Sequence, residues 1–467
     1  MLVYIASLLL SIYLFYSAPP SMDERFMSVC LVIALVEFLY YIYDNRKNRR
    51  YGLKGIVFRH SIIFSLCFFV VFFQCDIDFV FGIVDGSDSK IWIDKASVSK
   101  ALALSIMAYS CFLTGYRLFQ FKETNWITPS KTHYHFSAKY QLCLLCAAML
   151  LLYIAFVPRE YLYGGYALRE DSGSVNVILV LLQAVYIGMF SIFCYEHKYN
   201  TSNKSYWQEL KIPILLLLFY IGIVILSGRR TEAIRMSVLF IIAYAYAKGK
   251  KVNYKIVLPF IIISALLFSV VGFVRSDKMS GMEQGFREVS SNESLSPFTS
   301  ELSHSVNTLH TAVSFFPEKM DYTHGSTFFP NFLILVPGLD RIYLNNFVEK
   351  GTMTRSADVI TYLGLSKNET YGMGSSIVAD VYISFGPIGV FLIFIILGCF
   401  IRYLEVGTFC IKKSPFFLVL SFGCCSQFMF ACRGAVSNLF LSWSYATLIV
   451  LYFVLTSSRH ARTLPHL

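Results

Sequence analysis

The sequence is a succession of apolar segments, most of them close to the length that crosses a lipid bilayer. A membrane-spanning helix needs about 20 predominantly apolar residues, and about twelve segments approach that length. Their cores run over residues 2–16, 26–43, 61–74, 98–119, 142–157, 177–193, 212–226, 233–247, 256–274, 377–401, 415–431 and 436–455. Backbone amides and carbonyls find no water inside a bilayer, so each segment is expected to be helical. The sequence therefore predicts an all-α polytopic membrane protein of about 12 transmembrane helices.

Composition agrees with a membrane environment. Hydrophobic residues make up 56% of the 467 residues and charged residues only 15%, whereas charged residues are about a quarter of an ordinary soluble domain. The first segment has no Lys or Arg before its apolar run, unlike a cleaved signal peptide. We therefore interpret it as a retained helix.

The formal net charge of +11 arises from Lys and Arg residues that are concentrated in particular loops of this topology. Lys and Arg gather around residues 46–59, 117–139, 198–211, 248–255 and 402–413, and in the tail at 459–462. These positions belong to alternate loops, which is the positive-inside bias of membrane proteins. The bias predicts that both termini are cytoplasmic, and it explains the basic balance without a nucleic-acid partner.

One polar loop interrupts the pattern and is predicted to lie on the opposite side from the termini. It divides the chain into transmembrane helices 1–9 (residues 1–274), the loop (275–376), and helices 10–12 with a cytoplasmic tail (377–467). A loop of this length is far longer than a connector and is usually functional. We expect an amphipathic helix over 297–315 and an apolar patch over 328–336, too short to span. The loop should cap the bundle.

Arginine dominates the polar residues of the exported loops, where positive charge is normally disfavoured. The candidates are Arg169, Arg229, Arg230, Arg275, Arg341 and Arg433. A guanidinium can bind two phosphate or carboxylate oxygens at once, so the set predicts a cationic pocket for an acidic or phosphorylated substrate. The structural alternative is snorkelling at the interface or pairing with an acid, as Arg235 could pair with Glu232.

Four strings of residues around the long loop resemble those of bacterial O-antigen polymerases, the oligosaccharide repeat-unit polymerases. They are Leu226-Ser227-Gly228-Arg229-Arg230-Thr231, the helix 301–309, His324-Gly325-Ser326-Thr327 before the stretch ending at Pro337, and Gly374-Ser375-Ser376 through Asp380 to Phe385-Gly386-Pro387-Ile388-Gly389. Their order and their position around one exported loop carry the resemblance. It covers about the C-terminal half by motif and the rest by hydropathy.

This resemblance implies a metal-independent glycosyltransferase with a membrane fold of the GT-C type, acting at the periplasmic face of the bacterial inner membrane. Such enzymes transfer a growing glycan from its undecaprenyl pyrophosphate carrier to the sugar of an incoming lipid-linked repeat unit. The expected product is the surface polysaccharide of lipopolysaccharide. No cofactor is expected, and the resemblance leaves open a chain-length regulator protein as a partner.

The residues fit that chemistry. Without a metal, the negative charge of a leaving pyrophosphate must be stabilised by Arg or Lys. Arg229, Arg230 and Arg433 are the first choice because short hairpins hold them at headgroup depth. Apart from Asp76-Ile77-Asp78, which ends the third apolar segment, the exported loops contain no Asp-x-Asp motif and no His-rich ligand spacing, so no metal site is predicted.

The attacking sugar hydroxyl also needs a general base. Asp380, Glu301 and His324 are the candidates, of which we expect at most one to serve. Each has a structural alternative. Asp380 could pair with an arginine, Glu301 could be a solvated helix face, and His324 could cap a turn.

Two other functions compete with polymerisation. An O-antigen ligase, which moves the same lipid-linked glycan to another acceptor, explains the exported loop and the arginines equally well. A flippase or transporter would require polar or charged residues deep within its spans and a matched pair of halves. The predicted spans are nearly free of charge away from their ends, which favours an enzyme.

Overall fold

The structure is a computed structural model of the chain. It describes residues 1–47, 59–86, 92, 94–119, 133–136, 138–156, 173–199, 205–226, 229–248, 300–336, 338–349, 353–365, 372–409 and 414–460. The predicted ninth span and the first 25 or so residues of the long loop lie outside these ranges.

Helices make up almost all of the described chain. They are α1 (Leu2–Tyr16), α2 (Glu24–Lys47), α3 (His60–Phe72), α4 (Gln74–Val80), α5 (Lys95–Phe119), α7 (Lys139–Phe156), α9 (Gly173–Tyr199), α10 (Tyr206–Glu209), α11 (Lys211–Leu226), α12 (Arg230–Lys248), α15 (Ser300–Ser303), η3 (His304–Val306), α16 (Asn307–Phe315), η4 (Phe329–Leu335), α17 (Leu339–Phe347), α18 (Ser356–Gly364), α19 (Ile377–Phe409), α20 (Pro415–Ser426), α21 (Phe428–Cys432), η5 (Val436–Phe440) and α22 (Trp443–Thr456). Two short strands, β1 (His133–His135) and β2 (Ser458–His460), pair antiparallel with His133 opposite His460.

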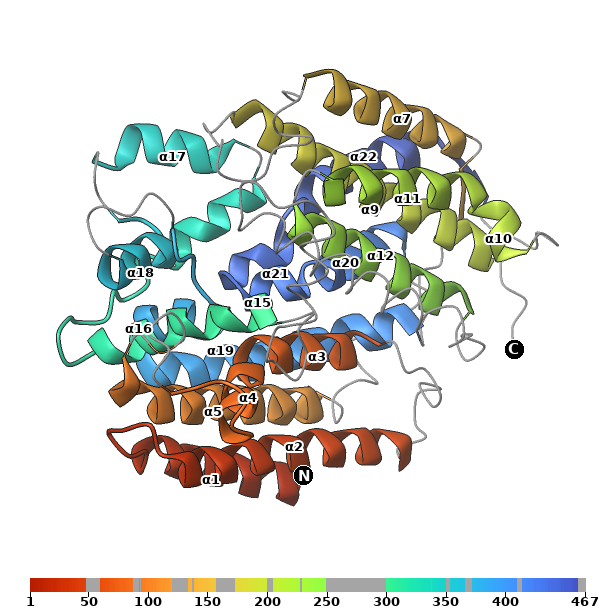
Figure 1. Ribbon diagram of the computed structural model, residues 1–467. Helices are drawn as coiled ribbons and strands as arrows, with labels where there is room; N and C mark the ends of the chain where they lie inside the picture. The colour runs from red at the N-terminus through yellow and green to blue at the C-terminus, as the bar shows by residue number, and fades with distance from the viewer. Residues whose placement is uncertain are drawn as a thin grey trace.

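The helices lie side by side in layers (Figure 1). Helices α1 and α2 form one outer layer, and both pack on α5, which in turn packs on α19. Beyond α19, the helices α9, α12, α20 and α22 pack on one another. The helices of the long loop, α16, α17 and α18, gather at one end of the bundle, and α10 lies at the other. The described part of the loop therefore caps the bundle, with α16 packed on α5 and α19.

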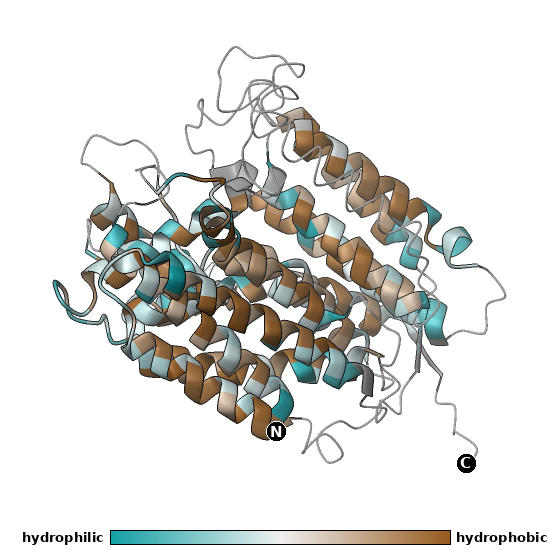
Figure 2. Ribbon diagram, turned by 60° about the horizontal axis from the view of Figure 1, so that its bottom comes forward, coloured by the Kyte–Doolittle hydropathy of each residue, from teal (hydrophilic) through white to brown (hydrophobic). Residues whose placement is uncertain are grey.

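The helices have the length and apolarity of membrane spans. Within the described ranges, six are long and apolar enough to cross a membrane, or up to seven if α3 and α4, bent by 52° at their junction, form one broken span. Helices α1 and α20 and most of α11 are shorter apolar helices. Hydrophobic residues cover the helices and hydrophilic ones collect toward their ends (Figure 2). The described chain is thus predominantly helical and compatible with a polytopic membrane protein, whereas the number twelve, the GT-C arrangement and the position of the long loop stay predictions.

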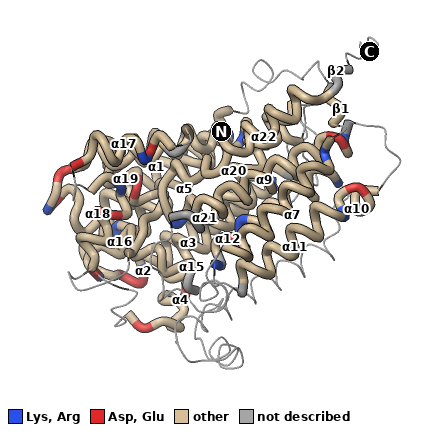
Figure 3. The backbone as a smooth tube through the Cα atoms, turned by 90° about the horizontal axis from the view of Figure 1, so that it is seen from above, with Lys and Arg blue, Asp and Glu red and all other residues tan. Residues whose placement is uncertain are grey.

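Charged residues also lie mostly toward the two ends of the bundle (Figure 3). Buried acids depart from the expectation that the spans carry few charges, and two examples lie in α2 and α19. Glu37 is buried within α2, and Glu405 is buried within α19. Arg59 and Arg402 lie 3.6 Å and 3.5 Å from the Glu405 carboxylate, so that charge is neutralised inside the protein.

Glycine sets the distance between α5 and α19. A Cβ added at Gly398 of α19 would lie 2.1 Å from the carbonyl oxygen of Phe112, and one added at Gly115 of α5 would lie 2.0 Å from that of Ile395. Small residues allow helix backbones to approach closely in a membrane, where van der Waals packing rather than the hydrophobic effect holds helices together. The two glycines therefore fix the closest contact of the bundle.

Replacing Gly398 by alanine should destabilise the protein, because the new methyl group meets backbone rather than a movable side chain. Overpacking of this kind costs about 1–3 kcal/mol, or more where the backbone must shift. Thermal unfolding of purified protein in detergent measures the loss. The matched control is Gly222→Ala in α11, where an added Cβ meets nothing within 4 Å. Equal stability of the two variants would contradict close α5–α19 packing.

Candidate functional site

Asp380 joins three segments that are far apart in the sequence. It lies in the first turn of α19 and is only 1% exposed. Its Oδ1 accepts a hydrogen bond from Ser356 Oγ at 2.6 Å, and its Oδ2 accepts one from the backbone amide of Val436 at 3.1 Å. Ser356 begins α18 of the long loop, and Val436 begins η5 in the last hairpin. Within the described chain, these bonds come from a hydroxyl and an amide rather than from an arginine.

Arg433 lies in the same hairpin and contacts the long loop. It follows α21 directly, and its Nε donates a hydrogen bond to Ser305 Oγ at 2.7 Å. Ser305 belongs to η3, which continues into α16. The arginine predicted at the mouth of the last hairpin is therefore held against the predicted loop helix, close in the chain to the Val436 amide that binds Asp380.

A second polar network supports α21 from the side of α12. Arg235 donates to both carboxylate oxygens of Glu232, at 2.9 Å and 3.1 Å, so the predicted pairing of these two residues is confirmed. The Arg235 guanidinium also lies 3.7 Å from the centre of the Phe430 ring in α21, a cation–π contact. Glu232 accepts a further hydrogen bond from Gln183, whose carbonyl oxygen accepts one from Ser442.

This network orders the start of α12, where the predicted arginine pair lies. Arg229 is half-buried, and its carbonyl oxygen accepts hydrogen bonds from the amides of Glu232 and Ala233. Arg230 is the first residue of α12. Helices α12 and α21 pack together, and basic residues lie beside them between the charged ends of the bundle (Figure 3).

The turn that contains His324 is fixed to α19 just beyond Asp380. The amide of Thr323 donates to the carbonyl oxygen of Ile383 at 2.9 Å, and Thr327 Oγ1 lies 3.2 Å from Ser384 Oγ. His324 itself is exposed and has a positive φ of 48°, a conformation that costs free energy in a non-glycine residue. The turn therefore presents His324 to the surroundings of the site.

Gly386 explains why α19 bends beside this turn. Its φ of 65° and ψ of −161° interrupt the helix before Pro387, and an added Cβ would lie 2.8 Å from the Tyr322 ring. Only glycine adopts this conformation readily. The Gly386-Pro387 pair seen in the sequence thus makes a kink into which Tyr322 fits.

His310 of α16 is a buried histidine that does not share this exposure. It stacks on Trp92 with ring centroids 5.7 Å apart, and burial lowers its pKa to about 3. The side chain is therefore neutral near pH 7, and it belongs to the packing of the loop helix.

The structure brings together only part of the predicted set. Asp380 and Arg433 are linked through the last hairpin, and the His324 turn is bonded to α19 one turn beyond Asp380. Arg229 precedes α12, which packs on α21. Arg341 is exposed on α17, and no hydrogen bond or ion pair joins it to the others in the described chain. Two predicted site residues, Arg169 and Arg275, lie outside the described residues, as do the side chains of Arg230 and Glu301.

Sequence reasoning missed the neutral partners of the site. Ser305, Ser356 and Gln183 carry no charge, and only Ser305 lies within one of the strings that resemble the family, the helix 301–309. Their one signal is position, since Ser305 and Ser356 lie in the long loop that was expected to cap the bundle.

In the described ranges, no group of three or more His, Cys, Asp or Glu side chains is placed to hold a metal ion.

Comparison with known proteins identifies the family. The family model described as O-antigen polysaccharide polymerase Wzy matches residues 1–462, nearly the whole chain. This chain belongs to the O-antigen polymerase family. Membership assigns it, at the level of the family, to the polymerases of surface polysaccharide, which are glycosyltransferases that use a lipid-linked oligosaccharide. No curated protein and no solved structure matches the chain.

The bonding of Asp380 in this polymerase family member yields a test of its role. An asparagine can keep both hydrogen bonds, because its carbonyl can accept from Val436 while its amide donates to Ser356 Oγ. An alanine leaves two buried donors unsatisfied, at about 1–3 kcal/mol each. We expect Asp380→Ala to lower thermal stability and abolish long polymer. Asp380→Asn should retain the stability and the long polymer of the wild-type protein.

Asp358→Asn, an exposed acid on α18, serves as the control for these variants. A stable but inactive Asp380→Asn protein would instead make Asp380 the general base. The measurements are thermal unfolding in detergent and the length distribution of surface polysaccharide.

Proposed function

We propose that the chain polymerises O-antigen repeat units at the periplasmic face of the bacterial inner membrane, with undecaprenyl pyrophosphate as the leaving group and without a catalytic metal. Arg229, Arg230 and Arg433 bind the pyrophosphate. An acceptor sugar hydroxyl attacks the anomeric carbon of the donor glycan. The bond between that carbon and the pyrophosphate oxygen breaks, and the hydroxyl proton passes to a general base.

The observation that supports this proposal is the meeting of three exported segments at one place. The last hairpin contributes Arg433, the long loop contributes Ser305 and Ser356, and the start of α19 contributes Asp380. Positive charge is normally disfavoured on this side of the membrane. The guanidinium of Arg433, positioned by its hydrogen bond to Ser305, is the kind of group that can bind two oxygens of an anionic substrate.

Base catalysis requires a group that can reach the acceptor. Asp380 is buried and both of its oxygens already accept hydrogen bonds, which favours a positioning role. His324 is exposed on a turn bonded to α19, so we propose it as the base, with Glu301 as the alternative on the loop helix. Histidine is the side chain that most often transfers protons as a general base.

The arginines supply the first test of this function. Arg229→Ala, Arg230→Ala and Arg433→Ala should each insert at normal levels yet lose long polymer, leaving single repeat units on the lipid core. Loss of one charge-assisted phosphate contact in a partly dry site costs on the order of 2–4 kcal/mol, or about thirtyfold to several hundredfold in rate. Replacement by Lys should also be damaging, because an ammonium cannot grip two oxygens at once.

The control for these variants is Arg25→Ala, an exposed arginine at the start of α2 on the outer layer. Full-length polymer from all three alanine variants would make the arginines interfacial anchors and place the active site elsewhere. In a null strain, free polymer without core attachment indicates a ligase, and accumulation on the cytoplasmic face indicates a flippase.

Metal independence has its own test. Purified protein should polymerise lipid-linked repeats in excess chelator, because the arginines alone stabilise the leaving pyrophosphate. Activity that disappears with chelator and returns with magnesium or manganese would assign that charge stabilisation to a divalent ion.

A further inference from the structure

A groove lies between α1 and α2, the two helices of the outer layer (Figure 1). It encloses about 340 Å³, which is near the lower limit for a pocket that holds a ligand or a large side chain. Its walls are apolar, with Leu113 of α5 in the floor. Other lining residues are Val3, Ala6, Leu10, Val32 and Ile33.

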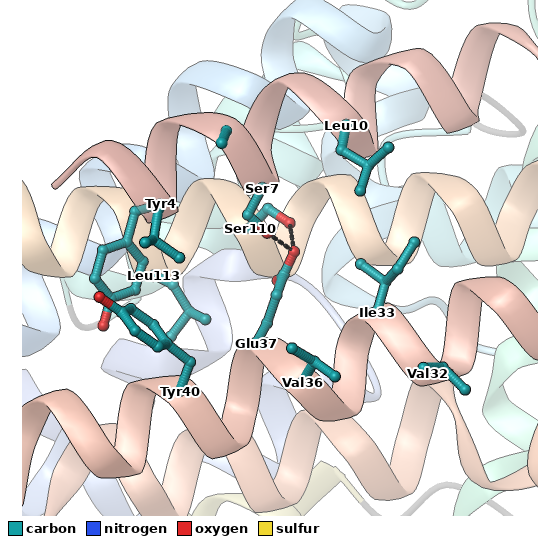
Figure 4. Close-up of a pocket in the computed structure, with 12 residues that line it drawn as sticks. Tyr4, Ser7, Leu10, Val32, Ile33, Val36, Glu37, Tyr40, Ser110 and Leu113 are labelled. Carbon is teal, nitrogen blue, oxygen red and sulfur yellow. Dashed lines mark hydrogen bonds between the residues drawn. The ribbon is translucent and has the colours of Figure 1, made fainter.

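One carboxyl group projects into this apolar groove (Figure 4). Glu37 is 8% exposed, and it is the only acid among the residues that line the groove. Its Oε1 accepts hydrogen bonds from the hydroxyls of Ser7 and Ser110, the second at 2.7 Å. Its Oε2 is buried and has no hydrogen-bond partner in the described chain. The groove therefore holds an unused hydrogen-bonding position.

The depth of Glu37 restricts what can use that position. It lies roughly 20 Å along α2 from Glu24, at about 1.5 Å per residue. Since the hydrocarbon core of a bilayer is about 30 Å thick, the carboxyl lies well inside the membrane. Lipid chains offer no hydrogen bond at this depth, and an acid inside a span marks a functional position by default.

The rim of the groove faces the lipid. The side chains of Leu10, Val32 and Val36 are 42%, 59% and 57% exposed, so an occupant can enter from within the bilayer. A hydrocarbon chain would leave Oε2 unpaired. A second copy of this chain, related by a twofold axis, would place its own Glu37 against this one, so that one acid would face another.

We propose that the groove is a docking site for a transmembrane helix of another membrane protein, which inserts an amide side chain, Asn or Gln, at mid-span. An amide carries both a donor and an acceptor, so it complements Glu37 whether the carboxyl is ionised or neutral. Polar side chains inside a membrane hold helices together in this way. This inference does not rest on the polymerase chemistry, because α1 and α2 contribute no residue to the candidate site.

Two synthetic peptides test the proposal with the full chain in lipid vesicles. One is a poly-leucine transmembrane peptide with a single central glutamine, and the other contains leucine throughout. Energy transfer between labelled protein and labelled peptide measures binding. The glutamine peptide should bind about three- to tenfold tighter than the leucine peptide. Equal binding of the two peptides to the wild-type protein would overturn the proposal.

Variants connect the preference to the groove. Glu37→Leu removes the carboxyl, and Ala6→Trp fills the groove while it leaves Glu37 in place; each should abolish the preference. Glu24→Gln at the exposed end of α2 and Leu9→Trp on the outer face of α1 are the matched controls, and both should retain it. A preference that survives Ala6→Trp would show that the peptide binds elsewhere.

Two further measurements identify a different occupant. A lipid that co-purifies with the wild-type chain and is lost from Ala6→Trp, with no preference between peptides, would assign the groove to a lipid chain. Dimers of this chain formed through a photo-crosslinker at Val32 would assign it to a second copy. Either result would overturn docking of a partner helix.

Discussion

The close contact between α5 and α19 is the constraint on which the rest of the structure depends. Gly115 and Gly398 allow the two backbones to approach until no Cβ would fit between them. Helix α5 then carries α1 and α2 on one side and supports α16 of the long loop, which packs on both helices. The distance between α5 and α19 therefore sets where α1 and α2, the helices beyond α19, and α16 of the long loop lie.

Helix α19 extends from this contact to the candidate site and positions the residues there. Its first turn carries Asp380, which binds α18 through Ser356 and the last hairpin through Val436. One turn later, Ile383 and Ser384 hold the segment around His324, and the break at Gly386 receives Tyr322. The motif residues shared with the O-antigen polymerases are thus largely explained by geometry. They fix part of the long loop and the last hairpin to the start of one helix.

Local sequence properties were sufficient for the membrane architecture. Apolar segments predict helices because a bilayer forces each backbone to satisfy its own hydrogen bonds. Each predicted segment within the described residues falls on one helix or on two helical elements with a break between them. The amphipathic pattern over 297–315 falls on three consecutive helical elements, α15, η3 and α16, from Ser300 to Phe315. The break between α3 and α4 and the buried pairing of Glu405 were not predicted, because each depends on neighbours from other helices.

The sequence by itself determined a helical membrane protein and a family, since hydrophobic length and motif order are properties of the linear chain; its one long capping loop stays a prediction. It also named Asp380 and Arg433 as candidates by residue type. Only the tertiary structure decided their partners. Arg433 and Ser305 are 128 positions apart, and Asp380 and Val436 are 56 apart. Uncharged partners such as Ser305 and Ser356 reach their charged partners only through tertiary packing, which no local sequence pattern encodes.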